Sequence, residues 1–155
     1  MVNGDTRLSP HFHLSEFTAS ETAVRLGLRN DPSEAEIQRL RSLCQLLEAV
    51  RVTLGGKPVS IASGYRSRLV NLDVGGAKHS AHIDGRAADF ICPGYGSPRE
   101  ICQRLSDSGL PFDKLINEGN WVHIQIQKDN EVPRRQVLTA VFSGDGVSYF
   151  SGLVQ

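Results

Sequence analysis

The chain has 155 residues, with 17 basic and 17 acidic side chains and a formal net charge of zero. Hydrophobic residues make up 39% and charged residues 22%, which is ordinary for a globular domain. Proteins dedicated to nucleic acid usually carry a basic excess, so this balance argues against that class. No apolar run reaches the length of a membrane span, so we expect no membrane insertion. The charge balance predicts no nucleic-acid partner. We also expect a monomer.

The cysteines and the N-terminal sequence limit the class further. Cys44, Cys92 and Cys102 are odd in number and lack C-x-x-C spacing, so they predict neither a disulfide framework nor a thiolate zinc site. Cys44 and Cys102 fall inside apolar helical patterns, where a free cysteine behaves as a small buried hydrophobe. The start of the chain contains no apolar run of signal-peptide length, so we expect synthesis in the cytoplasm.

The chain shows no internal repeats and no long linker, so we expect a single domain over residues 1–155. Residues 1–32 are predicted to be an N-terminal extension that packs on this domain as short helical turns. The clearest helix is predicted over residues 33–54. Ser33 and Glu36 form a capping box at its start, and its apolar residues follow a three-to-four spacing.

Shorter elements follow the first helix. In chain order we predict a strand at 58–64, a loop with one helical turn at 65–85, a strand at 87–91, a helix at 97–108, strands at 112–116 and 121–127, and a hairpin of 137–142 with 147–150. Helices lie mostly early and strands mostly late, without regular β-α-β alternation. This order predicts an α+β fold with a mainly antiparallel sheet and flanking helices.

One stretch of the sequence carries residues suited to metal chemistry. His82 and Asp89 lie seven positions apart across a loop-to-strand junction, and His123 lies inside the predicted strand 121–127. Strand alternation places His123 on the face opposite three apolar neighbours. Two imidazoles and one carboxylate are typical of a catalytic zinc site, which keeps a fourth position for water. Spacing alone also allows each histidine to be an ordinary exposed or hydrogen-bonded residue.

Several short motifs occur in a fixed order along the chain. They are Ser-Gly-Tyr-Arg-Ser at 63–67, Asn71, Val-Gly-Gly at 74–76, S-x-H-x-x-G-x-A-x-D at 80–89 and Trp-Val-His at 121–123. This series resembles the zinc D-Ala-D-Ala metallopeptidases. That group includes peptidoglycan D,D-carboxypeptidases, vancomycin-resistance D,D-dipeptidases and phage endolysin endopeptidases. The resemblance implies a zinc peptidase domain with the fold shared by Hedgehog domains and D,D-peptidases.

The resemblance also implies roles for individual residues. His82, Asp89 and His123 match the zinc ligands of the family. Arg66 matches the arginine that contacts the carbonyl or carboxylate of the substrate, a role that suits a guanidinium with its forked donors. Ser80 would lie beside the metal and bind the substrate or a ligand, although it also suits a purely structural role in the loop.

The proposed chemistry also requires a general base. Hydrolysis of an amide needs a carboxylate that takes a proton from water and passes it to the leaving nitrogen. Many relatives carry Asp or Glu three residues before the last histidine, but here that position is Asn120. Glu118, five residues before His123, is the nearest carboxylate, and we expect it to be the base. Asp84 remains an alternative.

The resemblance therefore predicts hydrolysis of peptide bonds in peptidoglycan stem peptides, by a D,D-carboxypeptidase or by an endopeptidase of the endolysin type. The sequence does not separate these two. The expected substrate lies in the cell wall, whereas the start of the chain shows no signal peptide. Together these suggest that the protein acts at the cell wall or periplasm after phage-type release. The alternatives are a non-catalytic, zinc-stabilised module that binds the cell wall, and a cytoplasmic D,D-dipeptidase. The loss of an acidic residue at Asn120 favours the binding module, and the open three-ligand set favours an enzyme.

Overall fold

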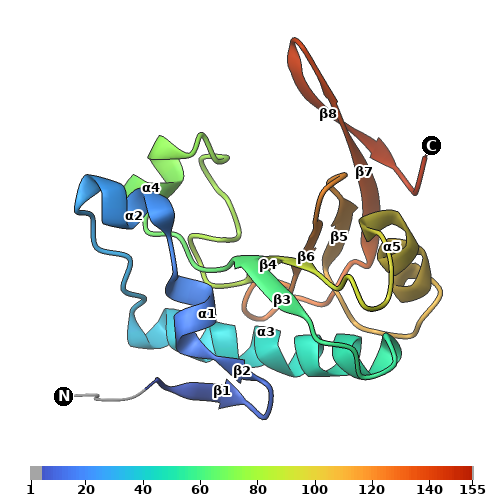
Figure 1. Ribbon diagram of the computed structural model, residues 1–155, viewed down its shortest axis with the longest axis horizontal. Coiled ribbons are helices and arrows are strands. Elements are labelled where there is room, and N and C mark those ends of the chain that lie inside the picture. The colour runs from blue at the N-terminus through green and yellow to red at the C-terminus, as the bar shows by residue number, and fades with distance from the viewer. Residues whose placement is uncertain (1–4, 155) are drawn as a thin grey trace.

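The computed structural model describes residues 5–154 and contains two sheets and five helices (Figure 1). The first part of the chain forms β1 (Arg7–Ser9), β2 (Phe12–His13), α1 (Leu14–Thr18), α2 (Glu21–Leu26), α3 (Glu34–Thr53), β3 (Ser60–Ser63) and α4 (Arg68–Asp73). The second part forms β4 (Ala87–Ile91), α5 (Pro98–Ser106), β5 (Lys114–Asn117), β6 (Val122–Gln125), β7 (Gln136–Ser143) and β8 (Gly146–Ser151). The predicted α+β class is confirmed.

The long helix α3 begins and ends where its sequence signals lie. The Ser33 side chain accepts a hydrogen bond from the backbone N–H of Glu36, and the Glu36 carboxylate accepts one from the N–H of Ser33. These bonds satisfy two of the donors that a helix start leaves open. Gly55 then takes a positive φ of 81°, which glycine adopts without steric strain and which ends the helix. The predicted capping box is confirmed.

The main sheet has six strands in the order β3-β4-β6-β5-β7-β8. All neighbours are antiparallel except β5 and β7, which run parallel. The prediction of a mainly antiparallel sheet is therefore confirmed, and the parallel pair is an addition to it. A parallel pair needs a crossover between its strands, and here β6 with the segment after it supplies that crossover.

Strand alternation divides the two faces of this sheet. Phe90 of β4, Ile124 of β6 and Leu115 of β5 are fully buried in the hydrophobic core, together with the apolar residues of α3 and α5. Residues one position away from these, such as Asp89 and His123, point to the opposite face. Figure 1 shows α3 running along the sheet, with α5 beside β5. The helices thus cover one face of the central strands, and the polar residues lie on the other.

The N-terminal segment packs on the rest of the molecule through two aromatic side chains. Phe12 and Phe17 are buried in the same core, and their rings meet edge to face with centroids 6.1 Å apart. The short helices α1 and α2 match the predicted helical turns. The hairpin of β1 and β2 was not predicted, because its strands are too short to show alternation.

The last two strands form a hairpin that extends from the body of the protein (Figure 1). Every residue of β8 is exposed, and Phe142, Tyr149 and Phe150 are the aromatic residues that this hairpin exposes. The predicted hairpin is confirmed, with strands slightly longer than expected. Within residues 5–154, no helix combines the length and apolar character that crossing a membrane requires.

The three cysteines are free and buried, and for Cys44 and Cys102 this burial was expected from the apolar helical patterns around them. Burial raises the pKa of the Cys44 and Cys102 thiols to about 12 in each case. A thiol with so high a pKa carries almost no thiolate at neutral pH, so these two residues are inert packing groups.

Candidate metal centre

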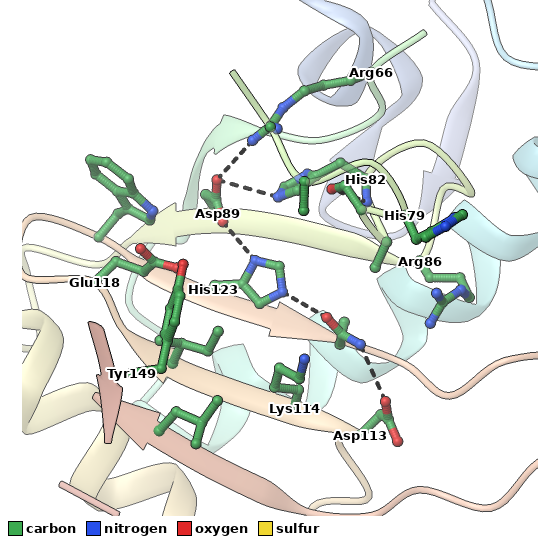
Figure 2. Close-up of a pocket in the computed structure, with 18 of the residues that line it drawn as sticks. Arg66, His79, His82, Arg86, Asp89, Asp113, Lys114, Glu118, His123 and Tyr149 are labelled. Atoms are coloured by element: carbon green, nitrogen blue, oxygen red, sulfur yellow. Dashed lines mark hydrogen bonds and ion pairs between the residues drawn. The ribbon is translucent and has the colours of Figure 1, made fainter. Parts of the chain in front are cut away.

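Two adjacent strands and the turn before them bring together His82, Asp89 and His123. Asp89 of β4 lies directly opposite His123 of β6 in the antiparallel register, and His82 precedes β4 in a tight turn. All three side chains are buried, and their candidate ligand atoms lie within 4.8 Å of one another. Figure 2 shows both imidazoles turned toward the Asp89 carboxylate. Three residues far apart in sequence thus converge on one point.

Each imidazole is held by one nitrogen and presents the other. His82 Nδ1 lies 2.7 Å from the backbone oxygen of Gly64, which can only accept, so Nδ1 is the nitrogen that donates. The other ring nitrogen, His82 Nε2, faces Asp89 Oδ2 at 3.4 Å. His123 Nε2 lies 2.8 Å from Gln125 Oε1, and its Nδ1 lies 3.0 Å from Asp89 Oδ1. Such outer contacts fix the orientation of histidines that bind metals.

The charges of this cluster suit a divalent cation. Burial would raise the pKa of the Asp89 carboxyl, but its contacts with the His123 and His82 rings outweigh this effect and hold that pKa below its usual range. Burial lowers the pKa of His82, although Asp89 opposes this, and so favours the neutral imidazole. A carboxylate and neutral imidazoles are the forms that bind metals.

The donor set fits zinc. Two imidazole nitrogens and one carboxylate oxygen are typical protein ligands of a catalytic zinc, and a set of three leaves a coordination position open. No cysteine takes part, because all three cysteines lie in the hydrophobic core, apart from this cluster. A structural zinc normally has four protein ligands, so this cluster has the composition of a catalytic site.

Arg66 lies in the wall of the same site. Its Nη2 is 3.6 Å from Asp89 Oδ2, its Nε donates to Ser63 Oγ at 3.3 Å, and its Nη1 donates to Asn71 Oδ1 at 3.0 Å. Burial lowers the pKa of Arg66, while the charges of Asp89 and Glu118 raise it. An arginine stays protonated in proteins, so these contacts hold a positive charge at the edge of the cluster.

Glu118 follows β5 and lines the same cleft, half-buried. The turn that holds it is closed by a hydrogen bond from the Glu118 N–H to the Trp121 carbonyl oxygen at 3.0 Å, and Gly119 takes a positive φ of 87°. Burial raises the pKa of Glu118, and the charge of Asp89 adds to this, whereas His123 and Arg66 lower it. Figure 2 shows the Glu118 carboxylate facing the cluster. Asn120 is not among the residues that line the cleft.

The loop before the cluster supplies the remaining predicted residues. Ser80 lines the cleft, and its Oγ accepts a hydrogen bond from the backbone N–H of His82 at 3.2 Å, so it shapes the turn that carries a candidate ligand. The neighbouring His79 also lines the cleft. Asp84 is not among the residues that line it, and its carboxylate pairs with Arg86 Nε at 3.2 Å. The alternative base named from the sequence therefore lies away from the cleft.

The cleft has a volume of about 810 Å³ and includes residues that the sequence did not single out. Phe142 and Tyr149 reach it from the hairpin of β7 and β8, and Gln125 and Asp113 form part of its floor. Figure 2 shows Tyr149 pointing toward Glu118 and His123. Alternation along β6 places Gln125 beside His123, but no local pattern indicates that the hairpin returns to the site.

Comparison with known proteins agrees with this geometry. The family described as peptidase M15 matches residues 10–125, which include all the cluster residues and end before the hairpin of β7 and β8. A zinc D-Ala-D-Ala carboxypeptidase of Streptomyces albus G is 46% identical over 73 residues, which are 47% of this chain and 28% of that protein. The match thus spans less than a third of that relative. The predicted resemblance is confirmed, and the chain belongs to the peptidase M15 family.

Proposed function

We propose that this protein is a zinc peptidase that hydrolyses peptide bonds in the stem peptides of peptidoglycan. The observation that carries the proposal is the convergence of His82, Asp89 and His123 in a cleft that also contains Glu118 and Arg66. Membership of the peptidase M15 family supports it, as does the similarity to a zinc D-Ala-D-Ala carboxypeptidase.

In this proposal His82 Nε2, Asp89 and His123 Nδ1 hold the zinc ion. When bound, zinc lowers the pKa of water toward neutrality and polarises a carbonyl group of the substrate. The buried, prearranged ligands need little rearrangement, because the Gly64 carbonyl and the Gln125 side chain already fix both imidazoles.

Glu118 is proposed as the general base and then the general acid. It removes a proton from the attacking water and delivers that proton to the leaving nitrogen of the amide. Burial raises its pKa, which moves the carboxyl toward the range where proton transfer in both directions is efficient. Asp89 is less suited to this role, because it is itself a proposed zinc ligand and its surroundings hold its pKa below the usual range.

Arg66 is proposed to bind the oxygen on which negative charge develops, or the terminal carboxylate of a stem peptide. Its guanidinium is already oriented by Ser63, Asn71 and Asp89, so it offers fixed donors without reorganisation. Ser80 lines the cleft close to His82 and is proposed to contact the substrate there.

Mass spectrometry of digested peptidoglycan tests the reaction. Release of free D-Ala indicates a carboxypeptidase, and cleavage within the stem or a cross-link indicates an endopeptidase. No product from the zinc-loaded protein would contradict the proposal and favour a binding module.

Replacement of the proposed base provides the second test. Glu118→Gln is expected to reduce turnover by about 100-fold to 10,000-fold, which is the usual contribution of general acid–base catalysis. Glu21→Gln makes the same chemical change in the first turn of α2, on the exposed surface, and should keep full turnover. If Glu118→Gln hydrolyses peptidoglycan as fast as the control, another group is the base.

A further inference from the structure

A chain of hydrogen bonds leads from the metal cluster to the surface of the protein. His123 Nε2 lies 2.8 Å from Gln125 Oε1, and Gln125 Nε2 donates to Asp113 Oδ2 at 3.2 Å. Asp113 in turn accepts from Arg134, through Nε at 2.9 Å and Nη2 at 2.8 Å. Figure 2 shows the dashed path from Asp89 through His123 to Asp113.

The direction of every bond in this chain follows from its far end. Arg134 can only donate, and an ionised Asp113 can only accept, so the side-chain amide of Gln125 must turn its NH₂ group toward Asp113. Gln125 Oε1 then faces His123 and accepts from its Nε2–H. A neutral imidazole with a proton on Nε2 keeps the lone pair on Nδ1, the nitrogen that faces Asp89.

The chain is buried and tied to the sheet. Asp113 is 4% exposed and Gln125 6%, so water cannot replace a lost partner easily. The backbone N–H of Asp113 also donates to the Gln125 carbonyl at 2.8 Å, and the N–H of Arg134 donates to Asp113 Oδ1 at 3.1 Å. These contacts fix the distance between the two side chains across the end of β5 and β6.

The two histidines differ in how securely they are held. His82 donates to a backbone carbonyl, that of Gly64, which has only acceptor capacity. His123 instead meets a side-chain amide, which would satisfy it equally well as a donor or an acceptor if it were free to turn. A further group is therefore needed to choose the orientation of Gln125, and Asp113 occupies that place.

We propose that Gln125, Asp113 and Arg134 are positioning residues that set which nitrogen of His123 is presented to zinc. Asp113 selects the orientation of the Gln125 amide, and Arg134 keeps Asp113 oriented and charged. The inference rests on the zinc site that the proposed function also uses. It does not depend on which peptide is cleaved, or on whether any peptide is cleaved.

Zinc affinity of two single variants tests the chain. Gln125→Met removes the acceptor for His123 at nearly constant volume. In Asp113→Asn, Arg134 should bind the side-chain oxygen of the introduced asparagine. The NH₂ group of that asparagine would then face Gln125 and reverse the orientation of the Gln125 side-chain amide. Both variants are expected to weaken zinc binding about 10-fold to 100-fold in competition with a chelator, which is the usual effect of removing such outer contacts. Asp129→Asn, which breaks a surface pair with Arg39, should leave the affinity unchanged.

Imidazole N–H resonances give a readout that a general loss of stability would not imitate. In the zinc-loaded wild type we expect slowly exchanging N–H protons from His82 Nδ1 and His123 Nε2. Asp113→Asn and Gln125→Met should shift or remove the His123 signal only, because Gly64 still holds His82. An unchanged His123 signal, with zinc affinity equal to that of the wild type, would overturn the proposal.

A double variant tests the bond directions themselves. The double variant combines Asp113→Asn with Gln125→Glu. The amide introduced at position 113 donates to the carboxylate introduced at position 125, and that carboxylate again accepts from His123 Nε2. The net charge of the pair is conserved, while the carboxylate moves one step closer to the metal. We expect zinc affinity to return to within about threefold of the wild type, since the carboxylate–histidine–zinc arrangement is restored. An affinity no better than that of Asp113→Asn alone would refute the directional argument, and this result needs no peptidase assay.

Discussion

Acid is expected to weaken the protein through one buried carboxylate, Asp113. Its hydrogen bonds with Arg134 hold the pKa of Asp113 at about 2, against an ordinary value of 3.8, although burial alone would raise it. One pKa unit corresponds to about 1.4 kcal/mol, so the ionised carboxylate stabilises the folded state by about 2 kcal/mol at neutral pH. Because the folded pKa is the lower one, this stabilisation is complete well above pH 3.8 and is lost as pH falls toward 2.

Comparison with Asp113→Asn isolates this effect, because the asparagine does not titrate. All other carboxylates are common to both proteins, so their titration cancels in the difference between the two free energies of unfolding. We expect that difference to shrink by about 1 kcal/mol between pH 6 and pH 3, and by about 2 kcal/mol by pH 2. Urea denaturation of the zinc-free proteins, followed by the fluorescence of Trp121, measures it. A difference that stays constant over this range would show that Asp113 titrates normally in the folded state, and the reasoning would be refuted.

Three further outcomes can be checked by denaturation. Gly64→Ala would place a Cβ atom 2.6 Å from the Phe17 Cα, so we expect a loss of about 1–3 kcal/mol, whereas Gly109→Ala, with open space around it, should change little. Leu47→Ala removes a fully buried side chain of α3 and should lower stability by about 2–5 kcal/mol, while Val52→Ala, on the exposed face of the same helix, should stay within about 0.5 kcal/mol. Zinc at 100 times its dissociation constant should raise stability by about 2.7 kcal/mol, and a chelator should remove this gain; stability that does not respond to zinc would contradict the metal site.

Local signals in the sequence were enough to place most elements. The capping boxes at Ser33 and Ser97 start α3 and α5, because side-chain caps depend only on residues three positions apart. Alternation also put His123 on the face opposite the core, and the structure confirms it. That face is nevertheless buried, since the loop before β4 and the hairpin of β7 and β8 cover it.

Features that depend on distant segments could not be predicted in this way. β5 pairs with β7 in parallel, and the sequence of neither strand indicates which other strand will lie beside it in the sheet. The approach of Tyr149 to Glu118 follows from that pairing, because β7 carries β8 with it. Likewise, Asp113 shows no motif, and its place beside Gln125 depends on the register of β5 against β6. Motif resemblance gave the cluster residues, but not the network around them.

The direct opposition of Asp89 and His123 in neighbouring strands has a consequence for folding. If β4 slipped by one residue against β6, every side chain of β4 would turn to the other face, and Ala88 or Phe90 would replace Asp89 among the imidazoles. Such a misaligned sheet would hold no metal, so zinc binds only molecules in the native alignment and draws the population toward them. The ion would then act as a selective check on strand alignment during folding, before it meets any substrate.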